Sequence, residues 1–279
     1  MQASAVFARS FCYYPLSPEM SVAKALPIDS QDHSITYLSP SLPVNMGDWW
    51  FEIATSNHFW VRRRFEVLKR FAGQVIEGSS RIAEIGCGNG LLQRDIEDHY
   101  GLRVAGFELN ELALRKNVSR ISPLYCYDIN QRDLNLRSQF DLVLLFDVLE
   151  HIDDEKEFLE SVKFHLTDSG GLVVNVPAHQ SLYSNYDRAA GHVRRYNTKQ
   201  LIQVAERSGF KVRAITYWGL PLLPLLLLRK AVSLDPTNGK AGFDPGGSSA
   251  NFALSLLARC EFLPQNLFGT SVMALLERF

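Results

Sequence analysis

The sequence predicts an α/β fold in which a doubly wound, parallel sheet carries helices on both faces. Short apolar runs alternate with amphipathic segments from residue 81 to the C-terminus, as in repeated strand–helix units. The run at 140–146, FDLVLLF, is apolar almost throughout, as a central strand buried on both faces must be. Gly86, Gly88 and Gly90 follow the first apolar run, where a strand must turn sharply into a helix.

The predicted strands and helices alternate in a regular order along this region. Strands are expected at 81–85, 104–108, 124–128, 140–146, 172–176, 211–217 and 271–277. Helices are expected at 91–100, 111–118, 156–166 and 198–208. Thr198 is expected to cap the last helix, and Gly209 to follow it. Because the units are βα repeats, successive strands should run parallel.

Three further segments lie outside this alternation. Residues 1–45 carry prolines among serines without periodicity, and we expect a flexible N-terminal extension. Residues 47–71 are rich in aromatic side chains at helical spacing, which predicts one or two amphipathic helices. These either pack against the sheet edge alone or also contact the substrate pocket, which the number of aromatic residues favours. Residues 218–268 form an apolar helical insertion between the last two strands. It should lie beside the pocket mouth, either as extra core or as an apolar lid that rests on a membrane.

The composition of the chain indicates how many domains it forms and which partners and compartments are expected. The 279 residues suffice for one large domain, expected at 46–279, and the formal net charge is −1. The basic residues are scattered, so no nucleic-acid partner is expected. The four cysteines lack metal-ligand spacing, and Cys87 lies inside the glycine turn, which favours a reducing, cytoplasmic compartment. No run approaches the ~18 to 20 apolar residues that span a bilayer.

The glycine turn carries a cofactor motif. Glu84, Gly86, Gly88 and Gly90 spell E-x-G-x-G-x-G, and Leu91 stands where a dinucleotide fold would have its third glycine. Free N–H groups at a helix N-terminus suit a nucleotide-like ligand, and the carboxylate suits a cationic group. The motif resembles motif I of class I S-adenosylmethionine (SAM) methyltransferases. This resemblance implies a Rossmann-like, seven-stranded sheet whose last strand is antiparallel and lies between the preceding two. A dinucleotide dehydrogenase and an empty turn are the alternatives.

The strand ends supply the other predicted cofactor contacts, because open α/β sheets bind ligands beyond the carboxyl ends of their strands. Glu108 is expected to accept the ribose hydroxyls, Leu109 to pack on the adenine, and Asp128 to bind the adenine amino group. Residues 146–152 resemble the segment of ubiquinone-type O-methyltransferases that lines the methionine half of SAM. The predicted cofactor residues are Glu84, Gly86, Cys87, Gly88, Gly90, Glu108, Leu109, Asp128, Ile129, Phe146, Asp147 and Val148.

The acceptor side should come from the loops after the fourth and fifth strands. Residues 186–196, Y-D-x-x-x-G-H-x-R-R-Y, resemble a segment of poorly characterised methyltransferases thought to act on lipid- or glycan-related substrates. His192 is the first candidate general base and His151 the second, with Asp187 as orienting partner. Structural roles remain the alternative for both histidines, as do loop-fixing ion pairs for the two arginines, which could otherwise grip an anion. The predicted substrate residues are Tyr183, Tyr186, Asp187, Arg194, Arg195 and Tyr196.

Together these features predict SAM-dependent O-methylation of a small acceptor that is lipid-linked or anionic. The alternatives are an RNA or protein methyltransferase and a non-catalytic SAM-binding partner protein. Asp147, Glu150, His151 and His192 also resemble the metal-binding set of some ubiquinone-type and RNA-terminal 2′-O-methyltransferases. Because Asp147 stands where that set has a glutamate, no metal is predicted. Peripheral membrane contact is expected through residues 218–230.

Overall fold

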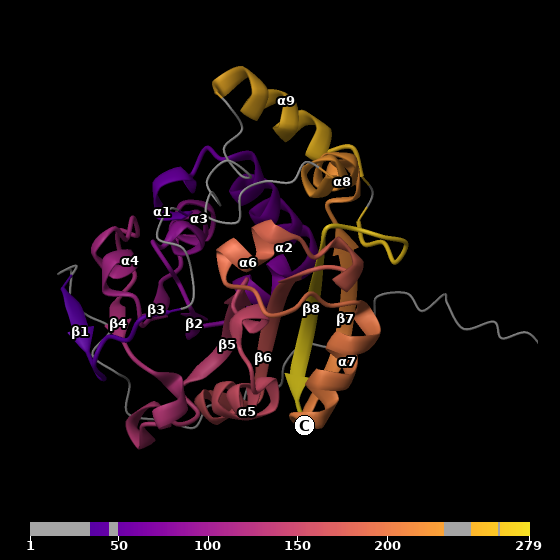
Figure 1. The fold of residues 1–279 in the computed structure, drawn as a ribbon. Helices are drawn as coiled ribbons and strands as arrows, with labels where there is room; N and C mark the ends of the chain where they lie inside the picture. Colours follow the sequence, from indigo (N-terminus) through magenta and orange to yellow (C-terminus); the bar gives the residue numbers. More distant parts are fainter. Residues whose placement is uncertain (1–33, 45–49, 232–246, 262) are drawn as a thin grey trace, which may run out of the picture.

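The structure is a computed structural model that describes residues 34–44, 50–231, 247–261 and 263–279. Eight strands form one sheet in the order β1-β4-β3-β2-β5-β6-β8-β7 (Figure 1). Their bounds are β1 Ile35–Tyr37, β2 Ile82–Ile85, β3 Val104–Glu108, β4 Leu124–Cys126, β5 Phe140–Phe146, β6 Leu166–Pro177, β7 Phe210–Trp218 and β8 Ser271–Arg278. All neighbouring pairs are parallel except those of β8, which runs antiparallel between β6 and β7. The predicted fold class is confirmed, with all seven expected strands present.

An eighth strand, β1, extends the sheet beyond the seven that the sequence predicts. It lies inside the segment expected to be a flexible extension and pairs in parallel with β4, so that Ile35 is opposite Leu124. Its three residues are too few to show a period in the sequence. Residues 1–33 of the predicted extension, and residues 232–246 and 262 of the predicted insertion, lie outside the described residues.

The four helices predicted between the strands are present to within three residues at each end, and one further short helix, at 185–190, was not predicted. The helix bounds are α1 Trp50–Ile53, α2 Phe59–Glu77, α3 Leu91–Tyr100, α4 Glu111–Arg115, α5 Glu155–His165, α6 Asn185–Ala190, α7 Thr198–Arg207, α8 Leu223–Ala231 and α9 Ser248–Ala258. The predicted cap of α7 is wrong by one residue. Asn197 is the N-cap, because its side chain accepts the N–H of Gln200 and the Gln200 side chain accepts the N–H of Asn197.

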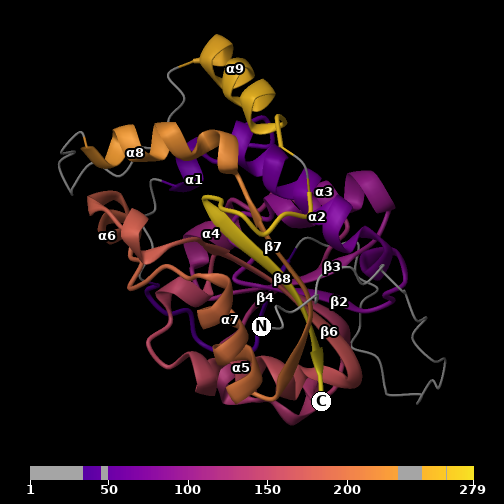
Figure 2. The same cartoon turned by 90° about the vertical axis from the view of Figure 1, so that its right-hand side faces the viewer.

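Two apolar layers hold the helices against the sheet. On one face, Leu68 and Ile76 of α2 and Ile96 of α3 pack against alternate residues of the central strands. On the other face, α5 and α7 cover the intervening strand residues, including Val143. Successive side chains of each strand point to opposite faces, so each strand contributes apolar side chains to both layers, as expected for a sheet buried on both sides. Helices α8 and α9 lie apart from these layers, at the end of the molecule where the parallel strands finish (Figures 1 and 2).

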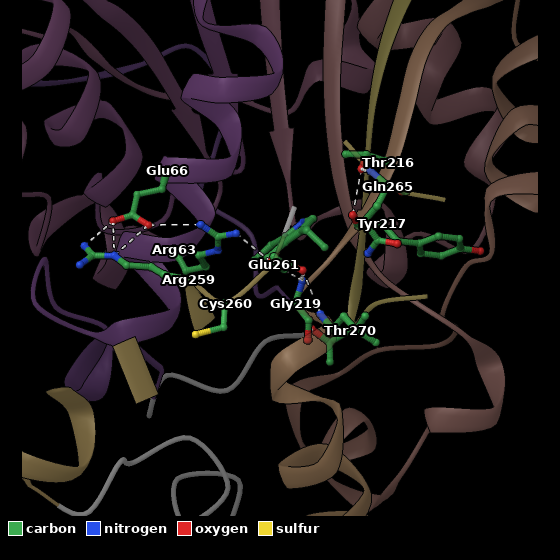
Figure 3. Close-up of polar contacts among 12 residues, drawn as sticks. Arg63, Glu66, Thr216, Tyr217, Gly219, Arg259, Cys260, Glu261, Gln265 and Thr270 are labelled. Carbon is green, nitrogen blue, oxygen red and sulfur yellow. Dashed lines mark hydrogen bonds and ion pairs between the residues drawn. The ribbon is translucent and has the colours of Figure 1, made fainter. Parts of the chain in front are cut away.

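A buried ion-pair network ties both ends of the apolar insertion to α2 (Figure 3). Arg63 of α2 and Glu261, which follows α9, have side chains only 2% and 3% exposed, and Arg63 Nη2 donates to Glu261 Oε1 at 2.9 Å. The Glu261 carboxylate also accepts the backbone N–H groups of Gly219 at 3.0 Å and Leu220 at 3.2 Å, at the start of the helical segment that leads into α8. A buried anion is therefore satisfied by a guanidinium and by free N–H groups at a helix start.

Candidate active site

A cavity of about 730 Å³ opens at the carboxyl ends of the parallel strands. This is where open α/β sheets bind their ligands. All of the predicted cofactor residues except Gly90 line it. The lining residues from this set are Glu84, Gly86, Cys87, Gly88, Glu108, Leu109, Asp128, Ile129, Phe146, Asp147 and Val148.

In the glycine turn, Gly86 and Gly88 line the cavity with backbone atoms that no side chain covers. Gly86 has φ +71°, and a Cβ there would lie 2.5 Å from Cγ2 of Val148, so no larger residue fits. Gly90, with φ +75°, is the N-cap of α3 and stands behind the wall. The N–H groups at the start of α3 thus have no side-chain cap, and the turn can approach a ligand closely.

Glu84 offers a carboxylate that no described side chain satisfies. It is buried at the cavity wall, and its Oε2 accepts no hydrogen bond from the described part of the chain. Burial raises the pKa of Glu84 to about 8, although the nearby charge of Arg64 acts in the opposite direction. A buried carboxylate of this kind favours a cationic ligand group, since an ammonium would supply both charge and N–H donors. The ammonium of SAM fits this requirement.

Glu108 faces the glycine turn from the end of β3. Its carboxylate accepts the backbone N–H groups of Gly88 at 2.9 Å, Leu109 at 2.8 Å and Asn110 at 2.9 Å. Burial raises the pKa of Glu108, while these three donors lower it. A carboxylate has about four lone-pair sites, so it retains acceptor capacity for a hydroxyl in the cavity. Asp128, at the end of β4, also lines the cavity and accepts the N–H of Asn130 at 3.0 Å.

Arg64 is a cavity residue that the sequence analysis did not identify. It lies on α2, donates to Asp147 Oδ2 at 2.5 Å, and stands over the ring of Phe146 at 5.5 Å. Asp147 adopts a left-handed backbone conformation with φ +56°. The only signal in the sequence was the run of arginines at 62–64 within an amphipathic helix, which does not show which of them faces inward.

A second group of polar side chains lies on the side of the cavity where the sequence predicts acceptor binding. Asp187 Oδ1 accepts from His192 Nδ1 at 3.0 Å and from Arg195 Nε at 2.7 Å. Burial opposes ionisation of Asp187, but the hydrogen bond from His192 and the charge of Arg195 hold its pKa below the ordinary value. An anionic Asp187 favours the tautomer that carries the imidazole proton on Nδ1. His192 then presents the Nε2 lone pair toward Glu150 and the cavity.

Glu150 completes this group as a second unsatisfied acid. It is fully buried, and neither carboxylate oxygen accepts a hydrogen bond from any described residue. Burial, and then the charge of Asp147, raises the pKa of Glu150 well above its ordinary value. Ligand atoms of Glu150, His151 and His192 all lie within 4.8 Å of one another, close enough to hold a metal ion together. Asp147, the fourth member of the resembled metal-binding set, is paired with Arg64 instead.

The predicted substrate residues divide into two sets. Tyr186 and Arg195 line the cavity. The other four lie behind its wall, where Asp187 binds His192 and Arg195 as described above. The Tyr183 hydroxyl donates to the carbonyl of His192 at 2.7 Å, and Arg194 Nη1 donates to that of Ile152 at 2.9 Å and pairs with Glu155 at 3.1 Å. The Tyr196 hydroxyl also binds the Glu155 carboxylate and lies 3.1 Å from the carbonyl of Leu149. These contacts hold the loop that carries His192.

The remaining wall is apolar and comes from the N-terminal helices and the insertion. The lining residues from these segments include Trp50, Phe51, Phe59, Trp60, Leu222, Leu225, Leu226, Leu228 and Leu254. The pocket contact predicted for the N-terminal aromatic residues is therefore present. Leu228 is also 62% exposed, and Phe252 on α9 is 71% exposed, so the apolar wall continues to the outer surface. None of the described helices is long and apolar enough to cross a membrane.

Comparison with known proteins identifies the family. A family model for a methyltransferase domain matches residues 57–215, more than half of the chain. Probable SAM-dependent methyltransferases of Mycolicibacterium smegmatis and Mycobacterium tuberculosis are 26% and 25% identical to it over 158 and 180 residues. These matches cover 56% and 63% of this chain, but less than two thirds of each relative, 60% and 65%.

Two solved structures share the fold. A putative sarcosine dimethylglycine methyltransferase from Galdieria sulphuraria is 11% identical, with 78% of this chain and 85% of that chain covered and a TM-score of 0.51. The [4+2]-cyclase SpnF is 14% identical, with coverage of 78% and 80% and a TM-score of 0.52. These two likenesses concern the fold alone. The family match agrees with the motif, the sheet order and the cofactor cavity, and the chain belongs to the methyltransferase-domain family, with SAM as its cofactor.

Proposed function

We propose that the protein transfers the methyl group of SAM to a hydroxyl oxygen of a small acceptor that is lipid-linked or anionic. The observation that carries this proposal is the Asp187–His192 pair, which presents an imidazole nitrogen to the same cavity that the glycine turn lines. One cavity thus joins a cofactor half and an acceptor half.

In the cofactor half, each predicted contact has a chemical counterpart on SAM. Glu84 binds the ammonium group, Glu108 accepts ribose hydroxyls, and Asp128 accepts the adenine amino group. The bare backbone at Gly86 and Gly88 lets the cofactor approach the sheet. With these contacts at the two ends of the cofactor, its methyl group would be available to an acceptor in the other half of the cavity.

In the acceptor half, His192 is the general base. Nε2 would take the proton of the acceptor hydroxyl as the hydroxyl oxygen attacks. SAM, when bound, would supply the methyl group and leave as S-adenosylhomocysteine. Asp187 orients the imidazole and stabilises the imidazolium that forms. A positioned base of this kind contributes a rate factor of roughly 10² to 10⁴.

The class of acceptor follows from the apolar wall. Leucines of α8 line the cavity and also reach the outer surface, which suits a hydroxyl compound with a lipid chain. Residues 218–230 then rest on the surface of a membrane, while the lipid chain of the acceptor enters the cavity between α8 and α9. Arg195 lines the acceptor half, and its guanidinium favours an acceptor with a nearby anionic group.

A second candidate mechanism is favoured by the unsatisfied carboxylate of Glu150. Glu150, His151 and His192 would hold a divalent cation, which supplies Lewis-acid polarisation of acceptor hydroxyls. His192 Nε2 would then be a ligand and could not act as base. Activity that survives chelation supports the base mechanism. Activity that is lost on chelation and restored by a divalent cation supports the metal mechanism.

The test is transfer of tritiated methyl from SAM into cell extract separated into lipid, glycan, RNA and protein fractions. We expect label in the lipid fraction. His192→Gln should lower incorporation roughly a hundredfold or more. His99→Gln, an exposed histidine on α3 away from the cavity, serves as the matched control. Label confined to RNA or protein would refute the acceptor class, and tight SAM binding without any label would indicate a non-catalytic protein.

A further inference from the structure

Two fully buried side chains outside the cavity connect to its wall through a chain of hydrogen bonds. Asn175 lies on β6, and Trp218 is the last residue of β7. Trp218 Nε1 donates to Asn175 Oδ1 at 2.8 Å, and Asn175 Nδ2 donates to Asp147 Oδ1 at 2.7 Å. Neither Asn175 nor Trp218 lines the cavity, whereas Asp147 does.

The indole of Trp218 fixes which way the Asn175 amide points. An indole N–H can only donate, so the amide must present its oxygen to Trp218 and its NH₂ group to Asp147. The reverse orientation would place two donors together and would set the amide oxygen against a carboxylate. The network therefore has one consistent arrangement, in which Asp147 receives a hydrogen bond.

The same strand also holds the backbone of Asp147. Its N–H donates to the carbonyl of Asn175 at 2.9 Å, and Arg64 donates to its second carboxylate oxygen. A left-handed conformation at a residue other than glycine is uncommon and persists only where surrounding contacts impose it. Here the contacts that impose it come from Asn175 and Arg64.

Helix α2 closes the network into a ring. Trp60 stacks on Trp218 with ring centroids 4.5 Å apart, and it lies four residues before Arg64 on the same helix. Trp60, Trp218, Asn175, Asp147 and Arg64 thus form a closed circuit through α2, β7 and β6. This circuit prevents the Asp147 carboxylate from rotating independently of the cavity wall.

We propose that Asn175 and Trp218 are positioning residues that hold Asp147 as an acceptor for the methionine end of the cofactor. The proposal rests on the proposed function in one respect, that this part of the cavity receives the ammonium of SAM. One donor on each Asp147 oxygen leaves further lone pairs for that ammonium. Trp218 and Asn175 act only through Asp147 and do not touch the cofactor.

The test compares two ligands by isothermal titration calorimetry. S-adenosylhomocysteine carries the ammonium and carboxylate groups, and 5′-methylthioadenosine lacks both. Trp218→Phe keeps an aromatic ring but removes the N–H, so the amide of Asn175 is free to turn. We expect the Kd of S-adenosylhomocysteine to rise roughly three- to tenfold, as for one lost hydrogen bond, and that of 5′-methylthioadenosine to stay unchanged.

The matched control is Tyr217→Phe. This neighbouring residue also loses one hydrogen bond, from the N–H of Thr198, and lies outside the circuit. It should leave the ratio of the two Kd values as in the wild type. Asn175→Leu should repeat the selective loss and decides the question if Trp218→Phe does not fold.

Three results would separate the explanations. Equal weakening of both ligands in Trp218→Phe and Asn175→Leu would mean that these residues serve the fold alone, and no weakening would also refute the positioning role. Failure of the wild-type protein to bind S-adenosylhomocysteine would refute the proposed function itself.

Discussion

Replacing Arg63 by methionine tests the account of the buried network beneath the insertion. The substitution keeps an apolar stem of similar length but removes the only charged partner of Glu261 among the described residues. Breaking a buried ion pair by removing one member costs about 3 to 5 kcal/mol, because the other charge stays buried. Since Glu261 retains the N–H donors of Gly219 and Leu220, we expect the lower end, about 3 kcal/mol.

The assay is urea and thermal unfolding followed by circular dichroism. For a chain of this size, about 3 kcal/mol corresponds to a fall in Tm of roughly 6 to 12 °C. Arg259→Met is the matched control, because Arg259 is 49% exposed and its ion pair with Glu66 should be worth at most about 1 kcal/mol. The double variant Arg63→Met/Glu261→Gln should recover most of the loss, since it leaves no unpaired buried charge and its amide oxygen can still accept the N–H groups of Gly219 and Leu220. Equal losses in Arg63→Met and Arg259→Met, or a double variant less stable than Arg63→Met, would refute the reasoning.

Three further predictions follow from the cavity. Gly86→Ala should abolish measurable SAM binding in calorimetry while Gly101→Ala does not, because a Cβ at Gly86 meets Val148, whereas Gly101 has open space around it. Affinity for S-adenosylhomocysteine should rise as pH increases from 6 to 8, because Glu84 has a pKa of about 8 in the unliganded protein and must lose its proton to pair with an ammonium. Glu84→Gln should remove this pH dependence, and a slope that persists would assign it to another group. Phe252→Glu should weaken co-sedimentation with phospholipid vesicles without changing SAM affinity, and unchanged sedimentation would argue against membrane contact at α9.

Much of the fold and of the cofactor half follows from sequence pattern, because both depend on local signals. A strand that ends just before Gly86 and a strand that ends in Glu108 finish at the same edge of the sheet in any parallel α/β fold. β1 was missed because three residues between prolines carry no usable period. Arg64 and Asn175 were missed because each meets Asp147 only through tertiary packing, across 83 and 28 residues of chain.

In the segment that carries His192, the sequence pattern did not predict which side chains line the cavity. Tyr183, Arg194 and Tyr196 stand in a segment rich in functional residue types, yet their polar groups bind backbone carbonyls and the Glu155 carboxylate behind the cavity wall. A motif records which residues occur together but not which side of a loop each one occupies. The same motif correctly paired Asp187 with His192, because five residues across a short helix bring the two side chains to one place.

Because Glu261 binds the backbone at Gly219, the two ends of the insertion meet at a single point on α2. Helix α9, which lies between them, is attached to α2 as well, because Asn251 accepts the N–H of Phe59 and Arg259 pairs with Glu66. A replacement segment that kept Asn251, Arg259 and Glu261 would change the apolar wall of the cavity and leave the sheet beneath it unchanged. Chimaeras of this kind would show whether the acceptor proposed above is selected by this wall.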